Sequence, residues 1–218
     1  TLGFAAAREV AMASDIVIFV GGLDQTQEGE NYAPGPVDRT NDSVELPGMQ
    51  QLLIQELAEV NPNVIAVIKS GGICAVPDAL DHMKGFLYAF YPGMEGGNAI
   101  ADVLYGDVNP SGKLPVTMPV NDEQMPAWND DYSDDYNGGY RYYDALDITP
   151  QFPFGFGLSY ADFAYSNLEV DAASYEAGQP ITASVQVTNT SALPGAEVVQ
   201  FYLTNEGAPV WMPEKELK

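Results

Sequence analysis

The sequence from Asp15 to Arg39, DIVIFVGGLDQTQEGENYAPGPVDR, decides the fold. Its β-branched and aromatic run, Ile16–Val20, predicts a fully buried strand, and the two glycines at 21–22 predict an abrupt end to it. The loop beyond the glycines carries the acidic residues Asp24, Glu28, Glu30 and Asp38. In an open α/β sheet, ligands bind outside the carboxyl ends of the strands, so this loop is a candidate position for carboxylate chemistry. On this segment alone, a solvated acidic loop is an equally good interpretation.

Composition and charge limit the classes of protein to consider. The chain has 218 residues, 46% of them hydrophobic, and 31 acidic against 8 basic residues give a net charge of −23. Nucleic-acid binding needs Lys and Arg to neutralise phosphates, so we expect no nucleic-acid partner, and the same excess of acid disfavours an anionic membrane. No apolar run approaches the roughly 18 residues of a membrane span, and we therefore expect no membrane partner.

Cysteine and histidine are each present once, as Cys74 and His82. A single cysteine excludes an internal disulfide and a multi-cysteine metal site, and a single histidine argues against metal and serine-triad chemistry. We therefore expect neither a metal ion nor a cofactor. Cys74 lies in an apolar segment, which predicts a small core residue, whereas His82 lies in a polar stretch, which predicts a surface position.

The first 120 residues alternate between helix and strand patterns. Helices are predicted at Phe4–Met12, at about Pro47–Glu59 and at Asn98–Leu104, and further apolar strands at Val64–Lys69 and Phe86–Phe90. Helices between apolar strands require crossover connections, which predicts an α/β domain with a mainly parallel sheet. We expect the three apolar strands to lie centrally in that sheet, and the helix over 98–104 to end at Gly106.

The composition of the sequence changes after residue 120, and its hydrophobic periodicity changes after residue 160. Residues 121–160 are rich in Asp, Asn, Gly, Pro and aromatic residues, which predicts an irregular connector held down by the aromatic clusters at 140–143 and 152–157. Residues 161–218 have a period of two, with strands predicted at Leu168–Val170, Ile181–Val187 and Val198–Leu203. This spacing is typical of a β-sandwich, and so few strands predict an incomplete one.

Several segments spread along the chain have a recognisable pattern. In order they are QEGE at 27–30 with DR at 38–39 and LP at 46–47, YPGMEGGNAIADVLYGD at 91–107, NPSGKLPVT at 109–117, GYRYYD at 139–144, FGFGLSY at 154–160 and GAEVVQ at 195–200. Each segment is weak evidence alone, but in this order they resemble glycoside hydrolase family 3, the β-glucosidase and β-xylosidase family.

The resemblance implies an enzyme of three parts: an N-terminal (β/α)8 barrel that carries a nucleophilic aspartate, an α/β sandwich domain that carries the acid/base, and a fibronectin-type sandwich. We expect residues 1–120 to form a partial three-layer α/β sandwich domain, 121–160 the connector, and 161–218 an incomplete fibronectin type III-like β-sandwich. A barrel needs about 250 residues, so the nucleophile is assigned to no residue here and the barrel is an expected partner within a longer protein.

The acid/base implied by the resemblance aligns best with Glu28. Glu30 is the runner-up, because the insertion at 31–36 departs from the commonest loop length. Asp38 and Arg39 are expected to order the base of the loop. Ser70 and the two glycines after it, which follow the second strand, are weaker candidates for lining a cleft between domains.

The function implied is that of a retaining, exo-acting β-glycosidase, with β-glucosidase preferred, acting on the terminal sugar of a β-linked oligosaccharide or an aryl glycoside. The alternatives are a β-xylosidase of the same family and a non-catalytic carbohydrate-binding or interaction module. A flavodoxin-like nucleotide-binding domain ranks far behind, because no Gly-x-Gly-x-x-Gly follows the first strand. The expected location is extracellular or periplasmic.

Overall fold

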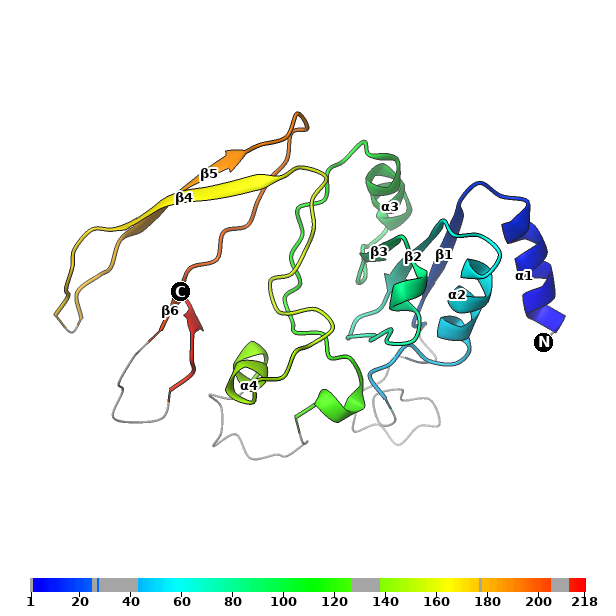
Figure 1. The fold of residues 1–218 in the computed structure, drawn as a ribbon, viewed down its shortest axis with the longest axis horizontal. Helices are drawn as coiled ribbons and strands as arrows, with labels where there is room; N and C mark the ends of the chain where they lie inside the picture. The colour runs from blue at the N-terminus through cyan, green and yellow to red at the C-terminus, as the bar shows by residue number, and fades with distance from the viewer. Residues whose placement is uncertain (1, 25–26, 28–42, 127–137, 177, 205–211) are drawn as a thin grey trace.

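The computed structural model describes residues 2–24, 27, 43–126, 138–176, 178–204 and 212–218. Figure 1 shows helices and a small sheet at the N-terminal end of an elongated molecule and a long hairpin at the other end. Between them, two extended segments run side by side, joined by the backbone hydrogen bonds of Met118 with Phe152 and of Leu114 with Phe156. No helix in the described part of the chain is both long and apolar enough to cross a membrane.

Within the described residues, the N-terminal part contains a parallel sheet of strand order β1-β2-β3. The strands are β1 (Val17–Gly22), β2 (Val64–Lys69) and β3 (Gly85–Tyr88), and the helices around them are α1 (Leu2–Met12), α2 (Gln50–Ala58), the short 3-10 helix η2 (Leu80–His82) and α3 (Gly96–Tyr105). The predicted alternation of helices with parallel strands is therefore confirmed.

The core of this part lies between the sheet and α2. Because side chains alternate across a strand, Val64, Ala66 and Ile68 of β2 share one face, and they pack against Ile54 and Leu57 of α2. All five side chains are buried. The apolar faces of α2 and β2 thus pack against each other, and hydrophobic burial stabilises this interface.

The prediction that the first strand is fully buried is wrong. Ile18 and Val20 of β1 are 45% and 57% exposed, whereas Val17 and Phe19 on the other face pack against the core. The reason is position: β1 and β3 are the two ends of the described sheet, and β2 alone is central. An apolar run predicts a strand well, but it does not say on which side of its neighbours the strand will lie.

The first strand includes both of its glycines and ends at the second, Gly22. Gly21 pairs with Ile68 and Gly22 with Lys69, so β1 continues in register to residue 22. Gly22 has a φ of +128°, and a Cβ there would lie 1.8 Å from the carbonyl oxygen of Lys69. The glycine is needed for this close approach rather than for breaking the strand.

The three predicted helices are confirmed, with bounds that differ by one to three residues from those predicted. α2 begins at Gln50 and not at Pro47, because Gly48 turns the chain with a φ of +71°. α3 ends at Gly106, which has the left-handed φ of 82° that was expected of its cap.

The connector is partly helical, unlike the irregular segment that we expected. It contains the 3-10 helix η3 (Asp122–Gln124) and the helix α4 (Tyr140–Ala145). Its aromatic side chains do hold it down, as predicted: Phe152 stacks on Phe86 of β3 with ring centroids 5.8 Å apart, and Tyr140 lies 5.2 Å from Phe154.

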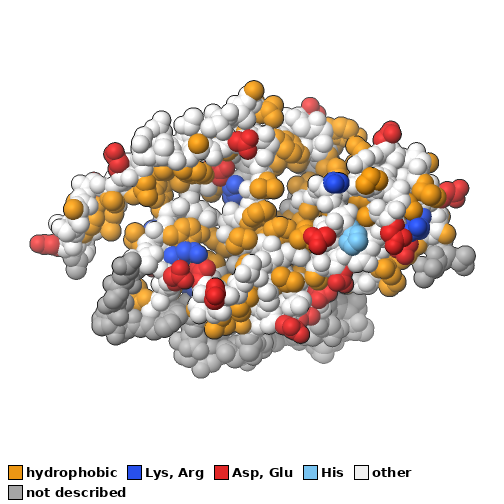
Figure 2. Space-filling model, in the orientation of Figure 1, with side chains coloured by type: hydrophobic (Ala, Val, Ile, Leu, Met, Phe, Trp, Pro, Cys, Tyr) orange, Lys and Arg blue, Asp and Glu red, His pale blue; other side chains and the backbone are white. Residues whose placement is uncertain are grey.

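The C-terminal part contains two antiparallel pairs. The long hairpin pairs β4 (Phe163–Val170) with β5 (Ala183–Asn189), and the short pair joins β6 (Tyr202–Leu203) to β7 (Glu216–Leu217). The first predicted strands are therefore confirmed, the third is shorter than predicted, and β7 was not predicted. Apolar side chains of the hairpin, among them Leu168 and Val170, face solvent in the described chain. Figure 2 shows hydrophobic side chains at the surface along this hairpin.

Replacing Gly22 by alanine tests the close approach of β1 to β2. The added Cβ meets backbone that cannot move without breaking strand pairing, so the free energy of unfolding in urea should fall by about 3 kcal/mol or more. Gly48→Ala is the matched control, because its φ is also positive but nothing lies within 4 Å of the added atom. It should cost only about 1 kcal/mol. Equal losses for the two variants would contradict the clash.

Candidate functional site at the carboxyl edge of the sheet

The acidic loop singled out from the sequence leaves the sheet at the carboxyl end of β1. Glu28, Glu30, Asp38 and Arg39 lie outside the described residues. The structure does describe the two stems of their loop, which are residues 23–24 on the entry side and 43–46 on the exit side. The described part of the candidate site therefore consists of these two stems and the loop that follows β2.

The entry stem continues the strand pairing by one more bond. The N–H of Leu23 donates to the carbonyl oxygen of Lys69 at 2.9 Å, and the Leu23 side chain is buried in the core. The N–H of Gln27 then closes a turn on the carbonyl of Asp24 at 2.9 Å. The chain therefore leaves β1 in a fixed direction.

The exit stem is anchored at two places. It forms a parallel bridge with the segment that follows β2, in which Ala75 donates to the carbonyl of Val44 and Leu46 donates to the carbonyl of Ala75, both at 2.9 Å. The N–H of Val44 also donates to Oδ1 of Asp122 in the connector at 2.7 Å. The loop thus returns to the same edge of the sheet from which it left.

A second loop, residues 70–74, lies at the end of β2 and is held by Tyr88 of β3. The Tyr88 hydroxyl donates to the carbonyl of Gly72 at 2.6 Å and accepts from the N–H of Cys74 at 2.8 Å. Burial raises the pKa of this hydroxyl well above its ordinary value, so it remains a protonated donor. Sequence reasoning gave no sign of this role for Tyr88, because it read the residue only as part of a buried strand.

The residues of this second loop divide between core and surface. Ser70 and Cys74 are completely buried and contact each other, with 3.2 Å between Sγ and Oγ. Gly71 and Gly72 are exposed. Cys74 is therefore a core residue, as predicted, and of the three residues proposed to line a cleft only the two glycines reach the surface. His82 is also at the surface, as predicted (Figure 2).

The chemistry that this edge can offer is that of a carboxylic acid delivered on an anchored loop. The part of the chain that the structure describes contains no group of three or more His, Cys, Asp or Glu side chains arranged to hold a metal ion.

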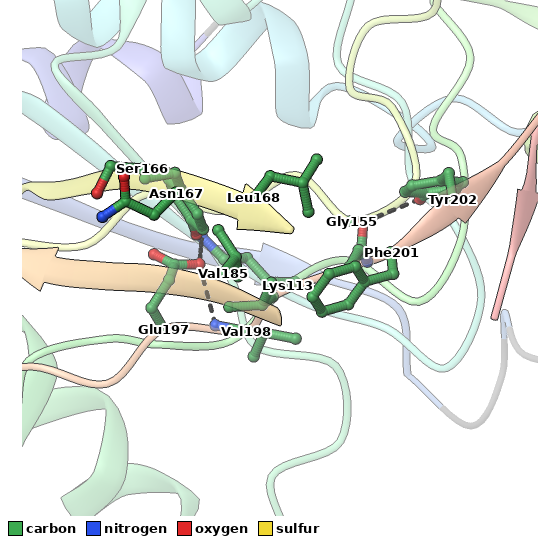
Figure 3. A pocket seen from close by; sticks show the side chains of 13 residues that line it. Lys113, Gly155, Ser166, Asn167, Leu168, Val185, Glu197, Val198, Phe201 and Tyr202 are labelled. Carbon is green, nitrogen blue, oxygen red and sulfur yellow. Dashed lines mark hydrogen bonds and ion pairs between the residues drawn. The ribbon is translucent and has the colours of Figure 1, made fainter. Parts of the chain in front are cut away.

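A hollow of about 720 Å³ lies in the C-terminal part, between β4 and residues 197–202 (Figure 3). Its charged groups are already paired: Lys113 Nζ lies 3.0 Å from Glu197 Oε1, and it donates to the carbonyl of Gly157 at 2.6 Å. The two side chains are only 16% and 12% exposed. A carboxylate that is held in this way is a structural anchor and not a general acid.

Three of the recognisable sequence segments, 109–117, 154–160 and 195–200, meet beside this hollow and form a junction. Asn109 accepts from Ser159 Oγ and Tyr160 N at 2.8 Å and donates to Pro194 O at 2.9 Å. A Cβ on Gly155 would lie 2.4 Å from the Gln200 side chain. These three segments pack on one another, which is a structural reason for their residue types.

Comparison with known proteins gives a consistent result. A family model described as the glycosyl hydrolase family 3 C-terminal domain matches residues 2–160. A probable β-glucosidase I of Aspergillus flavus is 42% identical over 223 residues, which cover 96% of this chain and 26% of that protein.

Solved structures agree with the family match. The family 3 β-glucosidase of Bifidobacterium adolescentis superposes with a TM-score of 0.85 at 35% identity, covering 99% of this chain and 32% of that one. The β-glucosidase of Kluyveromyces marxianus in complex with glucose gives the same TM-score and identity over 99% of this chain and 26% of that one. The chain therefore spans between 26% and 32% of the length of these three relatives.

The Lys113–Glu197 pair gives a test of the junction. Glu197→Gln leaves a mostly buried ammonium without its counter-charge, so the free energy of unfolding should fall by about 2 kcal/mol. Glu59→Gln is the control, because Glu59 also pairs with a cation, Arg8, but its side chain is 64% exposed. The unfolding midpoint of this variant should change little. A shift for Glu197→Gln no larger than that of the control would show that the pair does not hold the junction.

Proposed function

The chain belongs to glycoside hydrolase family 3, and we propose that it is the part of a retaining, exo-acting β-glucosidase that supplies the general acid/base. The observation that supports this most strongly is a match over 99% of the chain, at a TM-score of 0.85, to β-glucosidases, one of them in complex with glucose. The acidic loop and its anchored stems are where such a group would be delivered.

A retaining glycosidase needs two carboxyl groups about 5 Å apart on either side of the scissile bond. In the proposed enzyme Glu28 is one of them, with Glu30 as the alternative, and the other is an aspartate of a (β/α)8 barrel in the same protein. Glu28 first gives its proton to the departing glycosidic oxygen while the aspartate bonds to the sugar. The resulting carboxylate of Glu28 then takes a proton from the water that breaks the sugar–aspartate bond. No step of this scheme needs a metal or a cofactor.

The proposed substrate is the terminal β-linked glucose of an oligosaccharide or an aryl glycoside. The names of the relatives favour glucose over the xylose of the β-xylosidase alternative. The two are distinguished by comparing kcat/KM for 4-nitrophenyl β-glucoside and β-xyloside. We propose an extracellular or periplasmic location, which fractionation of the source cells would check.

The proposed domain organisation is a partial three-layer α/β sandwich over 1–120, the connector over 121–160 and an incomplete fibronectin type III-like sandwich over 161–218. The parallel sheet β1-β2-β3 supports the first assignment. The antiparallel β4–β5 hairpin, with apolar side chains still exposed, supports the last.

The 218-residue chain by itself should not hydrolyse β-glucosides. It supplies one of the two carboxyl groups, and loss of the nucleophile removes covalent catalysis. Release of 4-nitrophenol from its β-glucoside by the purified chain should therefore not exceed the rate without protein. Robust turnover would show that both carboxyl groups lie within these residues, in disagreement with the proposal.

The role of Glu28 is tested in a full-length protein that carries this chain. Glu28→Ala should lower kcat/KM by about 10²- to 10⁴-fold for alkyl glucosides, whose departing oxygen must be protonated. A dinitrophenyl glucoside should retain much of its first-step rate, and azide should restore its turnover by replacing the base-assisted water. Glu30→Ala should affect both substrates mildly and equally. The opposite pattern for the two variants would move the assignment to Glu30.

A further inference from the structure

Gln50, the first residue of α2, contacts with one carboxamide the two residues that flank the stems of the acidic loop, Gly22 and Pro47. Its Oε1 accepts from the N–H of Gly22 at 2.9 Å, and its Nε2 donates to the carbonyl of Gly22 at 3.0 Å. The same Nε2 donates to the carbonyl of Pro47 at 3.1 Å. Gly22 is the last residue of β1 before the loop, and Pro47 comes directly after the exit stem. A single side chain therefore joins the start of the loop to its end.

The contact with Gly22 imitates a neighbouring strand. Since Leu23 donates to Lys69 of β2, and successive residues of a strand point their N–H and C=O groups to opposite sides, those of Gly22 point to the other edge of β1. Within the described chain no strand pairs with that edge. A carboxamide has the same donor and acceptor as a peptide group, so Gln50 satisfies both groups of Gly22 at once.

The two glycines make room for this arrangement on two sides. A Cβ on Gly21 would lie 2.5 Å from Gln50 Oε1, and a Cβ on Gly22 would lie 1.8 Å from Lys69 O. Because it has no side chain, Gly21 leaves space for the Gln50 carboxamide, and Gly22 leaves space for the Lys69 carbonyl of the neighbouring strand. The contacts of Gln50 are part of a tightly packed junction and not a chance approach of a surface side chain.

The functional consequence follows from the short distance along the chain between this junction and the loop's acids. Glu28 is six residues beyond Gly22. A general acid must come within hydrogen-bond reach of the leaving oxygen, and a misplacement of about 1 Å can cost about 100-fold in rate. A residue that fixes Gly22 and Pro47, on either side of the loop, is therefore expected to affect the delivery of the Glu28 carboxyl group.

We propose that Gln50 is a positioning residue for the general acid/base, acting through Gly22 and Pro47, the residues that flank the two stems of the loop. The inference rests on the proposed function, in which Glu28 protonates the leaving group. It predicts a defect that depends on the leaving group, because only substrates that need the acid will be slowed when the acid is misplaced.

The test uses a full-length protein that carries this chain, with Gln50→Leu and a matched control. Gln55→Leu is the control, because Gln55 lies on the same helix and also donates to a backbone carbonyl, that of Asp78 at 2.7 Å. Gln50→Leu should lower kcat/KM about tenfold or more for methyl β-glucoside and less than about threefold for the dinitrophenyl glucoside. Gln55→Leu should leave both within about twofold while losing comparable thermal stability.

The outcomes separate this inference from the function on which it rests. If Glu28→Ala shows leaving-group dependence but Gln50→Leu slows both substrates equally or neither, the role of Gln50 is overturned and the function stands. If Glu28→Ala shows no such dependence, both are overturned. Should Gln50→Leu fail to fold, Gln50→Glu gives the same comparison, because it keeps an acceptor for Gly22 N–H and loses the amide donor.

Discussion

The close approach of Gly22 to the carbonyl of Lys69 is the constraint on which the rest of the N-terminal part depends. It keeps β1 and β2 in register to the end of the strand, so that Leu23 can add one more hydrogen bond and enter the core. The neighbouring Gly21 leaves space for the Gln50 carboxamide on the other edge. Sheet, helix and the start of the acidic loop therefore meet at one point, and a Cβ at Gly22 would clash with the backbone of β2 there.

A second set of contacts ties the later parts of the chain to this point. Asp122 of the connector accepts from Val44 in the exit stem, and Phe152 stacks on Phe86 at the edge of the sheet. Farther along, Lys113 and Asn109 contact both the end of the connector and residues 194–197, and so hold these segments together. Two of these side chains, Asp122 and Asn109, bond to backbone groups, which is how segments without regular pairing satisfy their peptide groups.

The amino-acid pattern predicted the element types well and their surroundings less well. The alternation of apolar strands with helices predicted the parallel sheet, because crossover connections leave few other arrangements. The exposure of Ile18 and Val20 was missed, since the order of strands in a sheet depends on long-range packing that a local run does not report. The two-residue strand β7 had no signal of its own, because it is defined only by pairing with β6. Gln50 was read as an ordinary helix residue, and its backbone pairing needed the structure. The assignment of Glu28 depends on resemblance alone and stays a prediction.

In the proposed enzyme this chain supplies the acid/base and another domain of the same protein supplies the nucleophile. The most direct test is to trap the covalent glycosyl intermediate in the full-length protein with a 2-deoxy-2-fluoro-β-glucoside that has a good leaving group, and to locate the label by mass spectrometry of proteolytic peptides. The expected result is one labelled aspartate, in a peptide outside residues 1–218. A label on Glu28, on Glu30 or on any other carboxylate of this chain would contradict it.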